Sequence, residues 1–227
     1  MRRFWTGLVT AMLVSACAQS PAPSLSPAPS GRSARGTINP ANIRRVIREL
    51  PPGYEVTSSV PNATSPVVIW GLGADPAEVR AQPPPCKRLA DPGNGRNQYA
   101  QGVSGSGVGG IINAVVVAFT SGSATLDHNV VAACRRWTLS TRRATARVKL
   151  TEAPRIDGVE TVGLVADIRM SVEAGIEIVS RAHTFIAYLG DYYAFTTLIT
   201  DPGSAFPPLK PRFAADLLVE TVPTLRS

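Results

Sequence analysis

The chain has 227 residues, with 23 lysines and arginines against 16 acidic residues and a formal net charge of +7. This length is sufficient for one domain with a hydrophobic core after removal of any terminal segments. The basic side chains are dispersed along the sequence in runs of at most two. A dispersed positive charge does not indicate a nucleic-acid surface, so we expect no nucleic-acid partner.

The N-terminus has the pattern of an export signal. Two arginines follow the first methionine, and the apolar run from Phe4 to Ala16 is shorter than the roughly 20 residues that a membrane-spanning helix needs. The run ends in Val14-Ser15-Ala16-Cys17, which resembles the lipobox of bacterial lipoproteins. That resemblance implies cleavage before Cys17 and lipid on its thiol. The alternative is an ordinary signal peptide with an incidental cysteine.

A stretch rich in proline, serine and alanine follows Cys17. Residues 18–36 have no apolar periodicity and cannot bury enough surface to form a core. Their alternating prolines favour extended segments of about 3 Å per residue. We therefore predict a signal peptide (1–16), a lipidated cysteine with its tether (17–36) and a globular extracytoplasmic domain (37–227). The lipid on Cys17 would hold this domain at the outer side of the cell membrane.

Two cysteines remain for the domain, Cys86 and Cys134. Export would place them in an oxidising compartment, where cysteines are expected to pair. A bridge closing about 49 residues adds roughly 4 kcal/mol in the loop-entropy model. The alternatives are a metal site or a catalytic thiol, but a metal needs more ligands than two cysteines and two distant histidines supply. We predict a disulfide, no metal and no cofactor.

The first half of the domain is predicted to mix helices with short strands. Asn39 is a capping residue and Pro40 fits the first helical position, while Ile43, Val46, Ile47 and Leu50 recur at helical spacing, so a helix is expected to start there. Residues 54–57 and 67–70 are expected to be strands, and 71–85 a surface excursion. Two further strands, 98–103 and 111–120, are expected on either side of a glycine-rich link over 102–110.

A second helix is expected after residue 124. Thr125 or Asp127 would cap it, and Val130, Cys134 and Trp137 would lie along one of its faces. A bridge from Cys134 would then join this helix to the segment around Cys86.

The second half of the domain is predicted to be a strand meander followed by a helix. Strands are expected over 147–150, 161–171, 176–189 and 192–200, with a hairpin at residues 173–175. An amphipathic helix is expected over 211–222. The predicted fold class is α+β: one domain with an antiparallel sheet, a meander in its C-terminal half, about three helices packed on it and one disulfide.

No group of residues in this sequence has the pattern of a catalytic site. Ser104 and Ser106 lack the flanking residues of a nucleophile elbow. The neighbours Asp127 and His128 would diverge, so Asp127 fits a helix cap better than a base. The other histidine, His183, is expected on a strand face with Arg181 and Phe185, as a structural residue or, alternatively, a base.

The glycine-rich link also has a structural interpretation. Phosphate loops require either a following Gly-Lys-Ser/Thr or a helix directly after the glycines, and here an apolar β-branched strand follows. A flexible hairpin link is therefore expected.

The acidic residues also have structural interpretations. Glu173 and Glu177 would flank a hairpin tip in solvent, and Asp167 would pair across strands with Arg169 or Arg181. We therefore predict no catalytic residues and no enzyme. The long strands are apolar on both faces near their ends, which leaves two interpretations open: a plain core, or a curved sheet lining an apolar groove for a lipid or a partner protein.

Several short motifs point to a family. The chain resembles an uncharacterised family of mycobacterial cell-envelope lipoproteins. The segments that carry this resemblance are the lipobox and tether, Pro51-Pro52-Gly53-Tyr54, Cys134-Arg135-Arg136-Trp137, Arg155-Ile156-Asp157-Gly158 and Ala187-Tyr188-Leu189-Gly190-Asp191. The resemblance covers roughly residues 37–225. These motifs are more distantly similar to the extracytoplasmic sensor domain of a mycobacterial serine/threonine kinase. That group carries two disulfides, whereas this chain has cysteines for one.

The resemblance implies binding or sensing at the cell envelope. We therefore expect a membrane-anchored lipoprotein with a non-catalytic ligand-binding or sensor-like domain. A structural partner in an envelope complex and an extracytoplasmic hydrolase are the alternatives. A lipid, a glycan or an envelope protein is the expected partner class, and the sequence identifies no ligand-binding residues.

Overall fold

The computed structural model describes residues 37–58, 60, 65–73, 75–172 and 176–227. These residues belong to one compact unit. The predicted signal peptide, Cys17, the tether and the hairpin tip with Glu173 lie outside the described residues.

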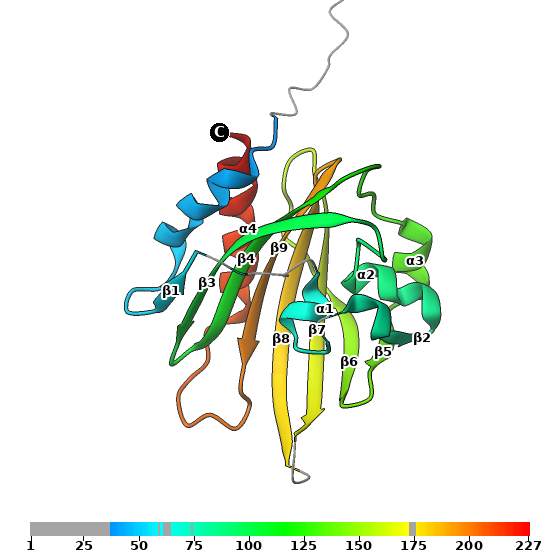
Figure 1. Cartoon of the computed structure of the whole chain (residues 1–227). Helices are drawn as coiled ribbons and strands as arrows, with labels where there is room; N and C mark the ends of the chain where they lie inside the picture. The colour runs from blue at the N-terminus through cyan, green and yellow to red at the C-terminus, as the bar shows by residue number, and fades with distance from the viewer. Residues whose placement is uncertain (1–36, 59, 61–64, 74, 173–175) are drawn as a thin grey trace, which may run out of the picture. The chain divides into compact units, whose positions relative to one another are not determined.

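The core of the fold is a nine-stranded antiparallel sheet (Figure 1). Its strand order is β1-β3-β4-β9-β8-β7-β6-β5-β2, so consecutive strands β5 to β9 form the expected meander. The strands are β1 (Glu55–Thr57), β2 (Arg80–Gln82), β3 (Gln98–Gly107), β4 (Gly110–Phe119), β5 (Arg136–Ser140), β6 (Ala144–Thr151), β7 (Glu160–Ser171), β8 (Glu177–Tyr188) and β9 (Tyr192–Thr200). The predicted α+β fold with one disulfide is confirmed.

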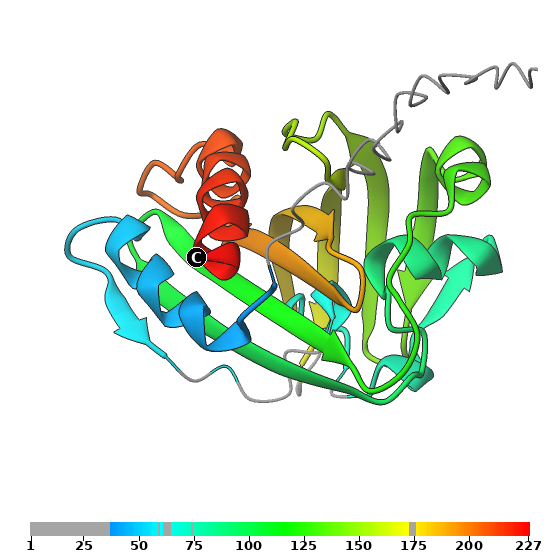
Figure 2. The ribbon, with the colours of Figure 1, turned by 90° about the horizontal axis from the view of Figure 1, so that it is seen from above.

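Helical segments pack on both faces of this sheet. They are η1 (Pro40–Glu49), α1 (Pro66–Ile69), η2 (Pro76–Glu78), η3 (Pro84–Cys86), α2 (Lys87–Ala90), α3 (His128–Ala133) and α4 (Pro211–Arg226). The first helix is a 3-10 helix capped by the side chain of Asn39. Figure 2 shows η1 and α4 side by side on one face, called here the outer face. The inner face is the opposite one, which α1, α2 and α3 cover.

Each face has its own hydrophobic core. On the outer face, Val46 of η1 and Leu218 of α4 pack with side chains from β3, β4 and β9, such as Ile112. On the inner face, Trp70 and Leu89 pack with residues of β4 to β9. Because side chains alternate along a strand, neighbouring residues of β4 contribute to different cores: Val115 to the inner one and Val116 to the outer one.

The helices of the described residues cover only half of the outer face. Across β6, β7 and β8 this face carries charged side chains, including Arg147, Lys149 and Arg169. Arg181 of β8 donates to Asp167 of β7 over 2.6 Å, which confirms the predicted cross-strand pair. Arg169 and Glu177 form a second exposed pair at 3.2 Å.

Several predicted elements of the first half were wrong. Residues 67–70 were expected as a strand, but Pro66 starts a short helix, α1, in which Val67 is buried against the inner core. Trp137 was expected on the helix of Val130, yet α3 ends at Ala133 and Trp137 lies in β5. Over segments this short, the spacing of apolar residues does not distinguish a helix from a strand, because the end of a helix and the start of a strand can be adjacent in sequence.

The glycine-rich link forms the expected hairpin, but most of it belongs to the two strands and not to a flexible link. β3 extends to Gly107 and β4 starts at Gly110, so only Val108 and Gly109 form the turn. A side chain at Gly107 would collide with the ring of Tyr54. The glycines therefore allow an aromatic ring to pack directly on the strand backbone. The predicted excursion over 71–85 contains the unforeseen edge strand β2.

Candidate ligand-binding site

The disulfide joins two helical segments over the inner face. Cys86 ends η3 and Cys134 follows α3, their Cα atoms are 5.5 Å apart, and both side chains are buried. The side chain of Asp127 accepts hydrogen bonds from the amides of Asn129 and Val130, which confirms its predicted role as the cap of α3. The bridge therefore holds α2 and α3 together at one end of the sheet.

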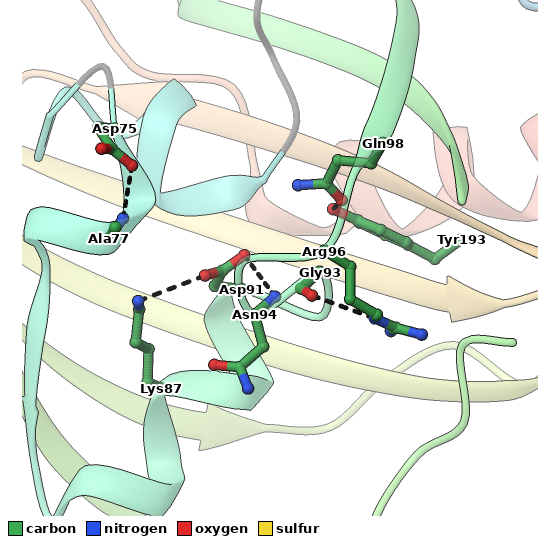
Figure 3. A network of polar contacts seen from close by, with 9 residues as sticks. All are labelled: Asp75, Ala77, Lys87, Asp91, Gly93, Asn94, Arg96, Gln98 and Tyr193. Carbon is green, nitrogen blue, oxygen red and sulfur yellow. Dashed lines mark hydrogen bonds and ion pairs between the residues drawn. The ribbon is translucent and has the colours of Figure 1, made fainter. Parts of the chain in front are cut away.

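A buried carboxylate organises the loop between α2 and β3 (Figure 3). Asp91 has no solvent exposure, although it carries a formal charge. Its Oδ1 accepts a hydrogen bond from the amide of Asn94 over 3.2 Å, and Nζ of Lys87 lies 3.6 Å from its Oδ2. Oδ2 has no hydrogen-bond partner among the described residues. Burial raises the pKa of Asp91, which Lys87, the Asn94 amide and Arg96 only partly oppose.

Arg96 fixes the same loop from its other end. Its guanidinium donates to the carbonyls of Pro92, Gly93 and Ser123 at 3.0–3.2 Å. The guanidinium carbon also lies 3.8 Å above the centre of the Phe119 ring, a cation–π contact. Because these bonds connect the loop after α2 with the segment before α3, Arg96 has a structural role in shaping the space between them.

That space is a cavity of about 320 Å³, at the lower end of the volumes typical of small-molecule sites. Its polar lining residues come from α2 and the loop after it, from the segment that leads into α3 and from the end of β8. The cavity is lined by Arg88, Leu89, Pro92, Gly93, Asn94, Arg96, Ser123, Thr125, Asp127, Val130 and Tyr188.

The charged groups of the cavity differ in how far they are engaged. Arg96 and Asp127 are occupied by the backbone contacts given above. Arg88 is exposed and makes no hydrogen bond or ion pair with the described residues. Burial and the nearby Glu160 raise the pKa of Tyr188, so its hydroxyl stays a neutral donor. The cavity therefore offers a free guanidinium beside neutral hydroxyl and amide groups, which suits a small ligand with an anionic group.

The two histidines lie apart, on different sides of the sheet. Nε2 of His128 lies 2.7 Å from Oε1 of Glu160 on the surface. His183 is half-buried on the outer face of β8, where burial and then Arg181 lower its pKa. The structure does not bring either of them together with the other histidine or with the cavity-lining Arg88.

The inner face between β8 and β9 is packed rather than hollow at its centre. The indole of Trp70 donates to Thr184 over 3.0 Å, and Thr184 contacts Thr197 at 2.9 Å. All three side chains are almost completely buried. At this point the interpretation as a plain core holds, and an apolar groove is absent from this part of the described inner face.

Sequence reasoning missed Arg88, Asp91 and Arg96 as site residues. The signal available was Asp91-Pro92-Gly93-Asn94, a sequence of strong turn-forming residues directly before a strand. It indicates an ordered loop, but the carbonyls that Arg96 binds come from residues up to 27 positions away. Two absences apply to the described residues alone: no helix there could span a membrane, and no three of their His, Cys, Asp or Glu side chains form a metal-binding group.

The chain is similar to known proteins in sequence and in fold. The model of a family described as a domain of unknown function, DUF5642, matches residues 39–226. No curated protein matches the sequence. Among solved structures, an uncharacterized protein from Mycobacterium smegmatis, the Rv0999 ortholog, is 18% identical with a TM-score of 0.60, covering 86% of this chain and 100% of that one.

A second solved structure is the extracellular domain of PknH from Mycobacterium tuberculosis. It is 12% identical with a TM-score of 0.39, and the match covers 85% of this chain and 93% of that domain. The similarity to the Mycobacterium smegmatis protein, at 18% identity, shows that the two proteins share a fold, and it shows nothing about ligands of the present chain.

Proposed function

The chain belongs to the DUF5642 family, and we propose that it is an envelope lipoprotein whose domain binds a small anionic ligand without catalysis. The cavity between the loop after α2 and the segment before α3 carries this proposal. Its walls are fixed by the disulfide and by Arg96, while Arg88 is free to pair with a ligand. A preformed polar cavity with one unpaired guanidinium is typical of recognition of a carboxylate or phosphate.

The location rests on the sequence and on the disulfide. The lipobox-like Val14-Ser15-Ala16-Cys17 supports lipid attachment at Cys17, and the bridge supports an oxidising compartment. Replacing Cys17→Ser is expected to release the protein from the membrane fraction and to remove the acyl mass of the mature chain. Retention of both would overturn the anchoring proposal without affecting the binding proposal.

Binding is tested by native mass spectrometry on the protein recovered from an actinobacterial host. The expected result is an additional mass of a few hundred daltons that is released on denaturation, as a cavity of this size implies. Arg88→Ala should lower the ligand-bound fraction at least about tenfold, which corresponds to the loss of one charge-assisted contact. Arg155→Ala is the matched control, because Arg155 is also exposed but lies outside the cavity. Equal occupancy in both variants would contradict the assignment of this cavity.

A further inference from the structure

A slot opens in the sheet where β9 ends. β9 is paired with β4 on one side and with β8 on the other, and its last residue, Thr200, lies opposite Arg181. β8 starts four residues earlier, at Glu177. Residues 177–180 of β8 are therefore paired with β7 but have no strand on their other side in the described part of the chain. The tip of the β3–β4 hairpin bounds the slot opposite them.

The backbone of β8 at this edge has hydrogen-bonding groups without a strand partner. In an antiparallel pair, every second residue directs its N–H and C=O toward the same neighbour. The Leu189 amide donates to the Tyr192 carbonyl at the β8–β9 turn, so odd-numbered residues of β8 face β9. Glu177 and Val179 therefore direct their backbone groups toward the slot. Continuing the register of β9 would place Pro202 opposite Val179, and proline has no N–H to donate. The Asp201–Ser204 turn then leads the chain away.

Apolar side chains line this slot and face solvent. Ile111 is 44% exposed, Ile178 is 49% exposed and Val179 is 40% exposed. Together with Ile199 and the glycines at the hairpin tip, they enclose about 580 Å³. An edge strand with unpaired backbone groups and exposed aliphatic side chains is a template for pairing with another strand.

The width of the slot indicates what it accommodates. β4 and β8 are separated by two strand spacings, about 9.5 Å, because each is paired with β9. β4 begins at Gly110, level with the last residue of β9, so the gap has the width of one strand at that point, and beyond it only the Val108–Gly109 turn lies opposite β8. A single extended segment fits this gap, whereas a second copy would bring its whole β7–β8 hairpin against the β3–β4 tip.

The charges at the slot indicate the chemistry of the segment. Although the chain carries a net charge of +7, both charged residues that line the slot, Glu177 and Asp201, are acidic. Glu177 is paired with Arg169, whereas the side chain of Asp201 accepts from the amide of Gly203 and has no ion-pair partner among the described residues. An aliphatic segment with a basic residue near Asp201 would complement both features.

We propose that this slot binds an extended aliphatic segment of a partner protein, with a basic residue at one end, as an added strand beside β8. The segment would continue the line of β9, take its hydrogen bonds from Glu177 and Val179, and place alternate side chains against Ile111 and Ile178. The described part of the chain begins at the opposite end of the sheet, near the C-terminus (Figure 1), where the amide of Asn39 donates to the carbonyl of Leu225.

The test uses the whole chain with Cys17→Ser and a fluorescent capped peptide of alternating threonine and valine that ends in lysine. Anisotropy is expected to report binding with a Kd of about 100 μM or tighter, in the range of short peptide motifs. Hydrogen exchange at the amides of Glu177 and Val179 is expected to slow at least about tenfold in the complex. A peptide with glutamate in place of lysine should bind more weakly because it meets Asp201.

Two changes separate strand addition from simple apolar contact. Val179→Pro removes one outward N–H at an edge position, where proline is tolerated, and should weaken binding at least about tenfold. Val179→Thr keeps the N–H and should bind at least about tenfold more tightly than Val179→Pro, and thermal melts establish that both variants fold. N-methylation of the valines of the peptide should abolish its binding to the parent chain, and this result does not depend on whether the proline variant folds.

Four results would overturn the proposal. Absence of binding by the lysine peptide at about 1 mM would do so, since that is the weak limit of specific recognition. Equal binding of the N-methylated peptide would show apolar contact alone. A fatty acid could displace the peptide and also bind the Val179→Pro variant as tightly as the parent chain. That result would assign the slot to an acyl chain. Dimerisation that Val179→Pro abolishes would assign it to a second copy. None of these results bears on the cavity at Arg88, which lies elsewhere on the domain.

Discussion

The two halves of the outer face differ sharply although they belong to one sheet. Over β3, β4 and β9, η1 and α4 cover the strands, and the outward side chains are apolar, as at Ile112 and Leu198. Over β5, β6 and β7 no described helix covers that face, and the outward positions carry Arg147, Lys149 and Asp167. β8 crosses the boundary, with Phe185 under α4 and Arg181 in solvent.

Side chains alternate between the two faces of the sheet in both halves, but the layers that cover those faces differ. In the covered half, both faces of a strand are apolar because each contributes to a core, so the strand reads as a continuous apolar run. In the uncovered half only the inner face is apolar, so charged and apolar residues alternate. The inner face of that half depends on small helices joined by a disulfide rather than on a long helix.

Removal of the disulfide is expected to have the largest effect. Replacing Cys86→Ala and Cys134→Ala opens a loop with a sequence separation of 48 residues, which costs about 4 kcal/mol in the loop-entropy model. Urea unfolding of the variant and the parent chain measures the loss. A loss below about 1 kcal/mol would mean that the inner helices are held by their packing instead.

The covered outer face is expected to be the next most sensitive region. Leu218→Ala in α4 removes a fully buried side chain and should lower the free energy of unfolding by about 3 kcal/mol. Arg147→Ala on the uncovered half is the matched control and should change it by less than about 0.5 kcal/mol. Similar losses for the two variants, measured by urea unfolding, would remove the distinction between the two halves.

Asp91 should make the stability of the domain fall as pH rises. Burial raises its pKa above the ordinary value of 3.8, so between these two values the folded state binds more protons than the unfolded state. Stability is therefore lost as pH rises from about 4 through the folded pKa, by about 1.4 kcal/mol for each unit of difference. Asp91→Asn keeps an acceptor for the Asn94 amide and should remove this slope. An unchanged slope in thermal melts would show that another group causes it.

His183 is expected to contribute a smaller slope of opposite sign, because its side chain is only half-buried. Its folded pKa is lowered from 6.5 by burial and by Arg181, so the unfolded state binds more protons in the window just below 6.5. Stability should fall as pH drops through that window, and His183→Gln should flatten the curve there. His128→Gln, at an exposed histidine, is the control. Equal flattening by both replacements would refute the assignment to His183.

The exposed pair of Asp167 and Arg181 is expected to matter least. Both side chains are about half exposed, so the coupling energy from a double-mutant cycle of Asp167→Asn and Arg181→Gln should be about 0.5 kcal/mol. It should vanish near 1 M salt, where screening acts over about 3 Å. A coupling above about 1.5 kcal/mol that resists salt would mean that this half of the outer face is covered by something else in solution.

Sequence reasoning succeeded where the signal was local. The meander from residue 161 onward was predicted to within one or two residues because its long strands alternate or run apolar between clear turns. Asp127 was recognised as a cap, and Asp167 as one partner of a cross-strand pair, for the same reason. The helix starting at Pro40 was also located, although it is a 3-10 helix, which the same apolar spacing does not distinguish from an α-helix.

The sequence by itself therefore determined the fold class and the pairing partner of Cys86, because strand periodicity and the number of cysteines are one-dimensional properties. Only the tertiary structure decided which outward faces are covered, where Arg88 lies relative to Tyr188, and that β9 stops short of β8. These features depend on residues far apart in sequence. Short helices such as α1 were decided in the same way, because four residues are too few to form a helix without the core they pack against.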